Sequence, residues 1–348
     1  MKRFIFVLIG LLTAFSVFSQ SNLLQPAATV NLIRTEAITV GQLRTEVLRF
    51  EQSAGRTLTQ AERLQVLDVM INERLVIQAA ERDRVLISDN EVTQQVTALR
   101  NQLAQQIGRQ PTDAEYAQAV MNDFGLEVNA FREALRKQLL TQKYLLHKKS
   151  DLLNSVRAPT DAEILTEYNL LRSSLMRPET IRITMIQVPY GADAAARTRA
   201  RTLADQLVRE INNNPATFDA VVQRGAAPNS GFQAADAGYI PRTQEARNYL
   251  GQAFMDVAFN LRQGQVSQLI EGLQGFQIIK VTENHAAKLL ELTDVYQLGT
   301  RVTVREYIGQ LMLEARQTTV TNQASAELIT ELRANNRTFT VYESNIRW

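Results

Sequence analysis

The sequence has 348 residues, of which 45% are hydrophobic and 21% charged, so it is long enough for two or three domains and shows no compositional sign of disorder. Its 38 basic and 36 acidic residues leave a formal charge of +2, which excludes the strong field that would attract nucleic acid or anionic lipid. There is no cysteine and there are two histidines, which excludes disulfides and a plausible zinc cluster.

The amino-terminal residues have the order of a secretory signal. Met1-Lys2-Arg3 is followed by an apolar run from Phe4 to Phe18 and then by small and polar residues. The run is shorter than the roughly 20 apolar residues that a membrane-spanning helix needs. We therefore expect residues 1–19 to be a signal peptide cleaved near Ser19, which leaves an exported chain with no integral membrane span.

The next part of the chain predicts a short strand followed by helices. In a capping box, a Ser or Thr hydroxyl and a Glu three residues later satisfy each other's backbone donors at a helix start. Such boxes occur at Thr59/Glu62, Ser88/Glu91, Thr112/Glu115 and Thr160/Glu163. We expect a strand at 28–33 and helices at 40–53, from Thr59 to about Arg82, and at 88–107, 112–124 and 128–148. These elements predict a compact helical domain with no obvious chemistry.

The helix that follows Thr59 is predicted to lie at the centre of this domain. Leu67 and Met70 belong to its apolar stripe, and Val66 and Val69 widen that stripe around most of the circumference. A helix that is apolar on so many sides is typically buried between neighbouring helices.

Several segments of this domain resemble the SurA-type chaperones. The helix Asp68–Ala80 is similar to the long Leu/Ile/Glu/Gln/Ala-rich helix of that family. Val30-Asn31, Ala37–Thr39 with Leu43, and Gly125–Val128 with Phe131–Arg136 follow in the family order. The resemblance implies a SurA-like helical domain over residues 28–176 and a periplasmic location.

Residues 177–285 predict an α+β sheet domain. Arg177-Pro178 ends a helix that starts at Thr160, because the residue before proline is pushed out of the helical region. A strand at 181–188, helices at 194–212 and 218–224, and a strand at 278–281 follow. This domain resembles a parvulin-type peptidyl-prolyl isomerase, and Gly264, Val266 and Ser267 match the turn before the last strand of that family.

The resemblance also suggests a candidate site, from which both family histidines are missing. Leu250, Phe254 and Phe259 occupy places similar to the hydrophobes of the proline pocket and core, while the histidine positions hold Met185 and Gln277. Core periodicity offers another interpretation of the three hydrophobes, as buried residues of a helix. We favour the core for Phe259 and the pocket for Phe254.

An isomerase of this type needs no nucleophile or metal, because it lowers the barrier by binding the twisted imide better than either planar isomer. Met185 cannot hydrogen-bond as imidazole does, and Gln277 cannot change its charge. Asp236 is the acid nearest to the position of the family's acid or thiol. We expect no metal and no cofactor, with His147 at a solvated helix end and His285 in an exposed loop.

The carboxyl-terminal part predicts a long helix and a last strand. The helix runs from a capping box at Thr303/Glu306 to about Asn335, and 338–342 alternates as a strand. In SurA-type proteins such a helix and strand return to complete the amino-terminal domain. Residues 286–348 are therefore expected to complete the core domain, with 28–33 as the strand's partner, and an exchange of this segment between chains would give a homodimer.

The sequence thus predicts an exported, mainly helical α+β chaperone with an inserted parvulin-like domain. Its expected partners are unfolded exported or outer-membrane proteins, which apolar and backbone contacts would select, and no nucleic acid. Two alternatives stay open. One is an active peptidyl-prolyl isomerase that tolerates Met185 and Gln277. The other is a structural or surface interaction protein without either activity.

Overall fold

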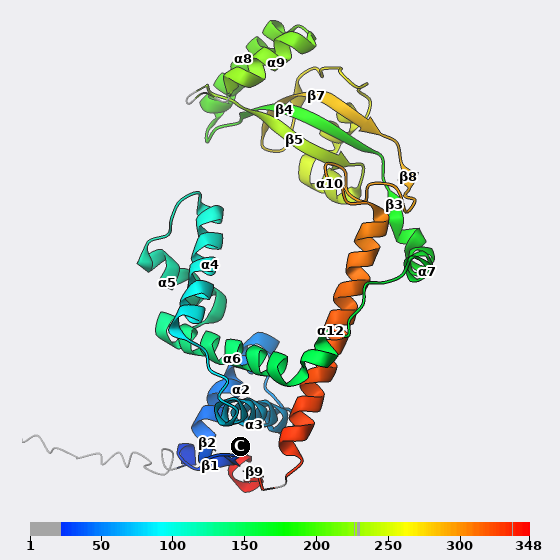
Figure 1. Cartoon of the computed structure of the whole chain (residues 1–348). Coiled ribbons are helices and arrows are strands. Elements are labelled where there is room, and N and C mark those ends of the chain that lie inside the picture. The colour runs from blue at the N-terminus through cyan, green and yellow to red at the C-terminus, as the bar shows by residue number, and fades with distance from the viewer. Residues whose placement is uncertain (1–21, 226, 228–229, 336) are drawn as a thin grey trace, which may run out of the picture. The chain divides into compact units, whose positions relative to one another are not determined.

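The computed structural model describes residues 22–225, 227, 230–335 and 337–348 (Figure 1). The predicted signal peptide at 1–19 lies outside the described residues. The chain divides into two compact units, one formed by the residues up to Val156 together with Ala315–Trp348 and the other by Arg157–Glu314. Residues 157–176 and 286–314, which the sequence predicts to belong to the helical domain, lie in the second unit with the sheet domain.

The first unit is mainly helical, and three of its helices begin at predicted capping boxes. They are α2 (Val40–Ala54), α3 (Gln60–Arg82), α4 (Asp89–Ile107), α5 (Asp113–Phe124), α6 (Val128–Leu153) and the carboxyl-terminal half of α12 (Val304–Arg333). The boxes at Thr59, Ser88 and Thr112 form with both hydrogen bonds, and an unpredicted one joins Thr39 to Gln42. Helix α6 is longer than predicted because it continues through a kink at Lys149, whose ammonium group contacts Glu331 of α12 at 2.6 Å.

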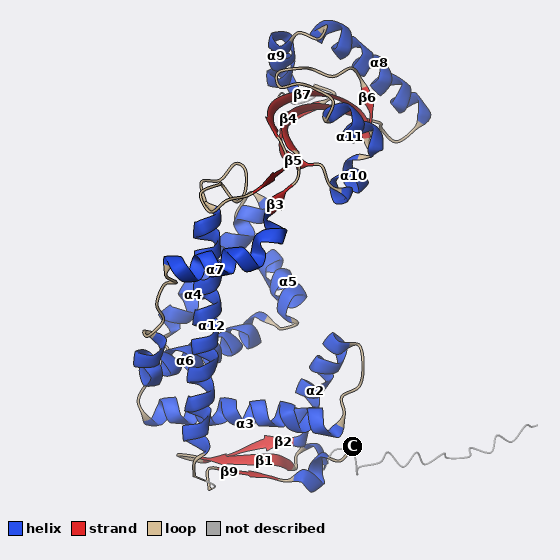
Figure 2. Ribbon diagram, turned by 90° about the vertical axis from the view of Figure 1, so that its right-hand side faces the viewer, coloured by secondary structure: helices blue, strands red, loops and turns tan. Residues whose placement is uncertain are grey.

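A three-stranded antiparallel sheet closes the first unit with strands from both ends of the chain (Figure 2). Strand β1 (Pro26–Asn31) lies between β2 (Thr35–Thr39) and β9 (Phe339–Val341). Ala28 pairs with Val341 and Val30 with Phe339, so the predicted pairing of the first and last strands is confirmed. The core that this sheet shares with α3 includes Leu67 of that helix together with Leu328, Leu332 and Ile346.

A buried glutamine joins the β1–β2 turn to α3. Gln78 is 0% exposed, and its Oε1 accepts hydrogen bonds from the backbone N–H groups of Leu32 and Ile33 at 3.0 and 3.2 Å. Its Nε2 donates to Glu36. Because buried polar groups are costly unless they are hydrogen-bonded, this residue fixes the turn against one side of α3.

The second unit contains a four-stranded antiparallel sheet with helices on both faces. The strand order is β5 (Gln233–Pro241), β4 (Thr180–Pro189), β7 (Gly275–His285) and β6 (Ile270–Glu271). Helices α8 (Ala194–Ile211) and α9 (Pro215–Gly225) pack on one face, while α11 (Gln252–Ala258), which follows α10 (Gln244–Leu250), packs on the other (Figure 2). The predicted α+β class is confirmed, although β5 was not predicted and β7 is longer than the strand expected at 278–281.

A smaller helical cluster completes the second unit. Helix α7 (Asp161–Leu171) continues as a 3-10 turn (Arg172–Leu175) and packs on the start of α12, where Ile164, Val304 and Ile308 are buried together. A short pair of strands, β3 (Met176–Arg177) and β8 (Lys288–Leu289), joins this cluster to the ends of the sheet domain. None of the helices formed by the described residues combines the length and apolar character of a membrane-crossing segment.

Candidate functional site

The positions that hold Met185 and Gln277 lie on neighbouring central strands and on one face of the second sheet. Met185 on β4 pairs with Ile279 of β7, and Gln277 of β7 pairs with Gln187 of β4. Met185 packs against the buried cluster that contains Phe254 and Ile279. Because side chains alternate along a strand, Gln277 points to the same face as Ile279. The structure therefore brings both positions to the face covered by α11.

The candidate pocket hydrophobes are packed as core residues. Phe254 of α11 is 0% exposed, Phe259 is 8% exposed, and Leu250 at the end of α10 is partly buried, all in one cluster with Met185. The guanidinium group of Arg242 also covers the Phe259 ring at 5.3 Å. Phe254 consequently presents no surface to a ligand in this conformation.

Gln277 is enclosed by the turn between β6 and β7. It is 6% exposed, and its Oε1 is buried without a hydrogen-bond partner. A Cβ atom on Gly272 would lie 2.5 Å from this oxygen, so a residue larger than glycine would force the amide to move. A thioether and a carboxamide do not titrate in the physiological range. Met185 and Gln277 can therefore position a ligand but cannot exchange a proton with it.

Asp236 lies in a different environment from these two residues. Its carboxylate accepts a hydrogen bond from Arg182 at 2.6 Å, and Arg182 also contacts Glu283 at 2.9 Å. Tyr239 donates to Glu283 at 2.8 Å, and His285 lies 3.0 Å from the same carboxylate. We call these five residues the Arg182 network. Asp236 pairs in register with Thr184 and not with Met185, so it is directed away from the α11 face.

Electrostatics in the Arg182 network favour the ionised carboxylates. Hydrogen bonds from His285, Arg182 and Tyr239 lower the pKa of Glu283 to about 2, and Arg182 lowers the pKa of Asp236. The expectation that His285 lies in an exposed loop was wrong, because it is the last residue of β7 and packs beside Tyr239. The expectation for His147 was right about solvent, since it is exposed, but it lies within α6 and not at its end.

A groove of about 800 Å³ in the first unit was not predicted from the sequence. It lies between α2, α3 and α6, and its apolar lining includes Phe50, Val66, Val69, Met70 and Leu126. Val69 is 62% exposed and Phe50 is 50% exposed. The expectation that α3 is buried around most of its circumference was therefore wrong on this side, where the widened apolar stripe faces the groove. The apolar residues that widen this stripe, Val66 and Val69, were the feature of the sequence that indicated an additional apolar surface here.

The charged residues around this groove balance one another. Glu46, Glu73 and Glu133 are matched by Arg49, Arg74 and Lys137. Several are also paired, with Arg49 3.2 Å from Glu46 and Lys137 3.3 Å from Glu73. Such a rim exerts little net attraction on either sign of charge. The groove would therefore select an occupant through apolar contacts and hydrogen bonds.

Within the described part of the chain, His, Asp and Glu residues do not form a group of three or more that could hold a metal ion.

The two units can be compared with known proteins through their sequences. Residues 1–145 match the profile of the SurA-like N-terminal domain, and residues 182–283 match that of the PPIC-type PPIASE domain. The chain therefore contains a SurA-like N-terminal domain and a PPIC-type domain. The second match falls within the predicted parvulin-like segment and contains Met185 and Gln277.

Relatives that match this chain over both domains carry the name Chaperone SurA. The protein of Pseudoalteromonas translucida is 24% identical over 246 residues, which cover 70% of this chain and 53% of the relative. That of Alcanivorax borkumensis is 23% identical over 333 residues, which cover 93% of this chain and 70% of the relative. The chain thus spans about half of the length of the first relative.

Solved structures similar to this chain include one from Campylobacter jejuni. Its description presents PEB4 and Cj1289 as two structurally related SurA-like chaperones. It is 14% identical, has a TM-score of 0.35, and the superposition covers 91% of this chain and 98% of that chain. PrsA from Bacillus subtilis is 18% identical with a TM-score of 0.24, covering 86% of this chain and 89% of that chain.

Proposed function

We propose that the chain is an exported chaperone that binds unfolded or extended polypeptides in the groove between α2, α3 and α6. The observation that carries the proposal is the exposed apolar lining, in which Phe50 and Val69 are each at least half exposed. Exposed apolar surface that gathers in a concave site is typical of a binding surface, and the volume of about 800 Å³ is within the range of ligand sites.

The polar groups of the groove suit an unfolded client. Gln138, Thr141 and Gln142 of α6 line one wall with uncharged donors and acceptors, which can pair with the backbone of a segment that has no secondary structure. Because the charged rim is balanced, the groove discriminates weakly between clients of different charge. This combination supports broad recognition of apolar segments.

We propose further that the PPIC-type domain has lost most or all isomerase activity. Met185 and Gln277 stand where the resemblance places the two histidines, and Phe254 is fully buried. An isomerase would need an apolar surface to hold the proline ring and a polar network beside the twisted imide. The active-isomerase alternative therefore requires α11 to move so that Phe254 becomes exposed.

The proposed clients are unfolded exported or outer-membrane proteins, and the proposed location is the periplasm. The secretory character of residues 1–19 and the relatives named Chaperone SurA support both parts. Cell fractionation followed by mass spectrometry of the amino terminus tests the location. Light scattering of the purified chain tests the proposed homodimer.

An aggregation assay with a matched pair of variants tests the chaperone proposal. Val69→Glu places a charge in the groove, whereas Leu146→Glu places the same charge at an α6 position that is similarly exposed, 59% against 62%, and does not line the groove. We expect the wild type and Leu146→Glu to delay aggregation of a chemically unfolded client equally, and Val69→Glu to delay it much less. A wild type that gives no delay at an equimolar ratio would favour the structural-protein alternative.

A further inference from the structure

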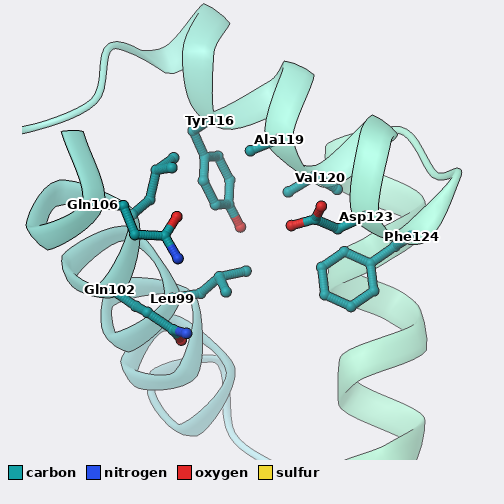
Figure 3. A pocket seen from close by; sticks show the side chains of 9 residues that line it. Leu99, Gln102, Gln106, Tyr116, Ala119, Val120, Asp123 and Phe124 are labelled. Atoms are coloured by element: carbon teal, nitrogen blue, oxygen red, sulfur yellow. The ribbon is translucent and has the colours of Figure 1, made fainter. Parts of the chain in front are cut away.

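A second, smaller pocket lies between α4 and α5 in the first unit. Its volume is about 60 Å³, and its lining includes Leu99, Leu103, Tyr116, Val120, Asp123 and Phe124 (Figure 3). This is several times the roughly 10–15 Å³ of such space that one water molecule needs, so the pocket has room for a small organic group. Leucine, valine and phenylalanine side chains form the apolar walls.

The polar end of the pocket is the hydroxyl group of Tyr116. Tyr116 is 2% exposed, and its hydroxyl is buried without a hydrogen-bond partner. Burial raises the pKa of this group, so that it stays a neutral hydroxyl able to donate one hydrogen bond. Phenylalanine would fill the same space without burying an unpaired hydroxyl, which is unfavourable. The position of this hydroxyl therefore indicates a bound acceptor.

Asp123 supplies the opposite kind of group. It lies two turns after Tyr116 on α5, and its carboxylate points into the pocket toward the Tyr116 hydroxyl (Figure 3). The pocket thus presents a donor and an acceptor to the same small space. Gln102 and Gln106 of α4 add amide groups to the lining.

The surrounding charges select a neutral ligand. An anion would be repelled by the Asp123 carboxylate. Arg100 lies outside the lining, with its guanidinium group 4.4 Å from the centre of the Tyr116 ring and paired with Asp113. A cation beside the Tyr116 hydroxyl would meet the positive field that Arg100 and Arg132 exert on this group. A neutral group that accepts at one atom and donates at a neighbouring atom avoids both penalties.

We propose that the α4–α5 pocket binds a primary carboxamide, whose carbonyl oxygen accepts from the Tyr116 hydroxyl and whose NH₂ group donates to the Asp123 carboxylate. Two sources carry this chemistry: the Gln or Asn side chain of a bound polypeptide, and a free small amide. The polypeptide source rests on the proposed function, whereas the free amide does not.

The test follows the methyl resonances of Leu99, Leu103 and Val120 in the full chain while acetamide is added. Acetate and N,N-dimethylacetamide are the matched probes, because the first is an anion and the second has no N–H. We expect saturable shifts with acetamide and clearly weaker binding of both other probes. Equal shifts with all of them, or none with acetamide, would overturn the proposal.

Two tyrosine variants separate binding from folding. Loss of one hydrogen bond should weaken acetamide binding by about two- to tenfold in Tyr116→Phe. Tyr144→Phe is the matched control, since Tyr144 is the other fully buried tyrosine of the unit and its hydroxyl is bonded to Asp83 outside the pocket. Tyr144→Phe should bind acetamide as the wild type does. Unchanged binding in Tyr116→Phe would overturn the assignment.

A peptide arm distinguishes the two sources. Peptides that differ only by Gln, Glu or Leu at one position are added to the same sample. Preferential shifts with the Gln peptide would assign the carboxamide to a polypeptide, whereas acetamide binding without a Gln preference would assign it to a free amide. Acetamide binding in a chain that fails the aggregation assay would uphold the pocket and remove the chaperone proposal.

Discussion

Replacement of Ile346 by alanine tests whether the carboxyl-terminal segment is part of the core of the first unit. Ile346 follows β9 and is 0% exposed in the cluster that also contains β1 and α3 residues. Loss of its buried carbons costs about 0.8 kcal/mol for each, or about 2.5 kcal/mol together, and the remaining cavity adds to this. We expect the free energy of unfolding of the first unit to fall by about 3 kcal/mol.

Trp348 gives a direct assay for this unit. It is the single tryptophan of the chain, and its ring lies against the guanidinium groups of Arg44 at 4.7 Å and Arg63 at 5.6 Å, on α2 and α3. Its fluorescence during urea unfolding should therefore report the first unit. With a urea dependence of about 2 kcal/mol per M, the midpoint should fall by about 1.5 M.

Ile33→Ala is the matched control, because the same side chain is removed from a position of the same unit that is 42% exposed. Its midpoint should move much less. Amide hydrogen exchange at the β1 positions that bond to β2 provides a second reporter, since detachment of the carboxyl-terminal segment alone would change the fluorescence and expose the β1 amides that bond to β9, but not those that bond to β2. Equal shifts in the two variants, or unchanged exchange at these β1 positions in Ile346→Ala, would refute the reasoning.

Three further predictions concern individual side chains. Tyr116→Phe should leave the free energy of unfolding unchanged or raise it by about 1 kcal/mol, because it removes an unpaired buried hydroxyl. Tyr144→Phe should lower the free energy of unfolding by about 2 kcal/mol, because it removes a hydrogen bond to the Asp83 carboxylate. Chemical denaturation of the two variants measures both changes. Glu283 has a pKa of about 2 in place of 4.5, so its stabilisation is complete above about pH 4.5 and is lost as the pH falls toward 2. Since it is one-third exposed, Glu283→Gln should cost only about 1 kcal/mol at pH 7, and this difference should vanish in melts near pH 2. The double variant Met185→His with Gln277→His should give at most a small isomerase rate in a protease-coupled assay, because Phe254 stays buried. A rate typical of an efficient isomerase would contradict the conclusion that Phe254 presents no surface to a ligand.

Local signals explain why most helices were predictable. A capping box is contained within four residues, so Thr59 and Ser88 mark helix starts whatever surrounds them. Strand β5 (Gln233–Pro241) had no such signal, because its alanine, aspartate and glycine residues have low strand propensity. It forms because its backbone pairs along β4. Tertiary pairing overrides propensity there.

The candidate sites were less predictable than the fold. Met185 and Gln277 were located through the resemblance. Spacing offered burial as one interpretation of Phe254, but its full burial depends on the packing of α11. The groove requires Phe50 of α2 and Val69 of α3 to approach α6, which only the tertiary arrangement establishes. Likewise, Tyr116 has the spacing of an ordinary core residue, and its unpaired hydroxyl is visible only in the structure.

Site-specific photocrosslinking tests the central claim most directly, because it asks where an unfolded polypeptide binds. A photoreactive phenylalanine derivative is placed at Val69 in the groove or, as the control, at the similarly exposed Leu146 of α6. Irradiation with a chemically unfolded exported protein should give a strong crosslink from position 69 and a weak one from position 146. Equal yields from both positions, or a crosslink from position 146 alone, would contradict the assignment of the groove as the client-binding site.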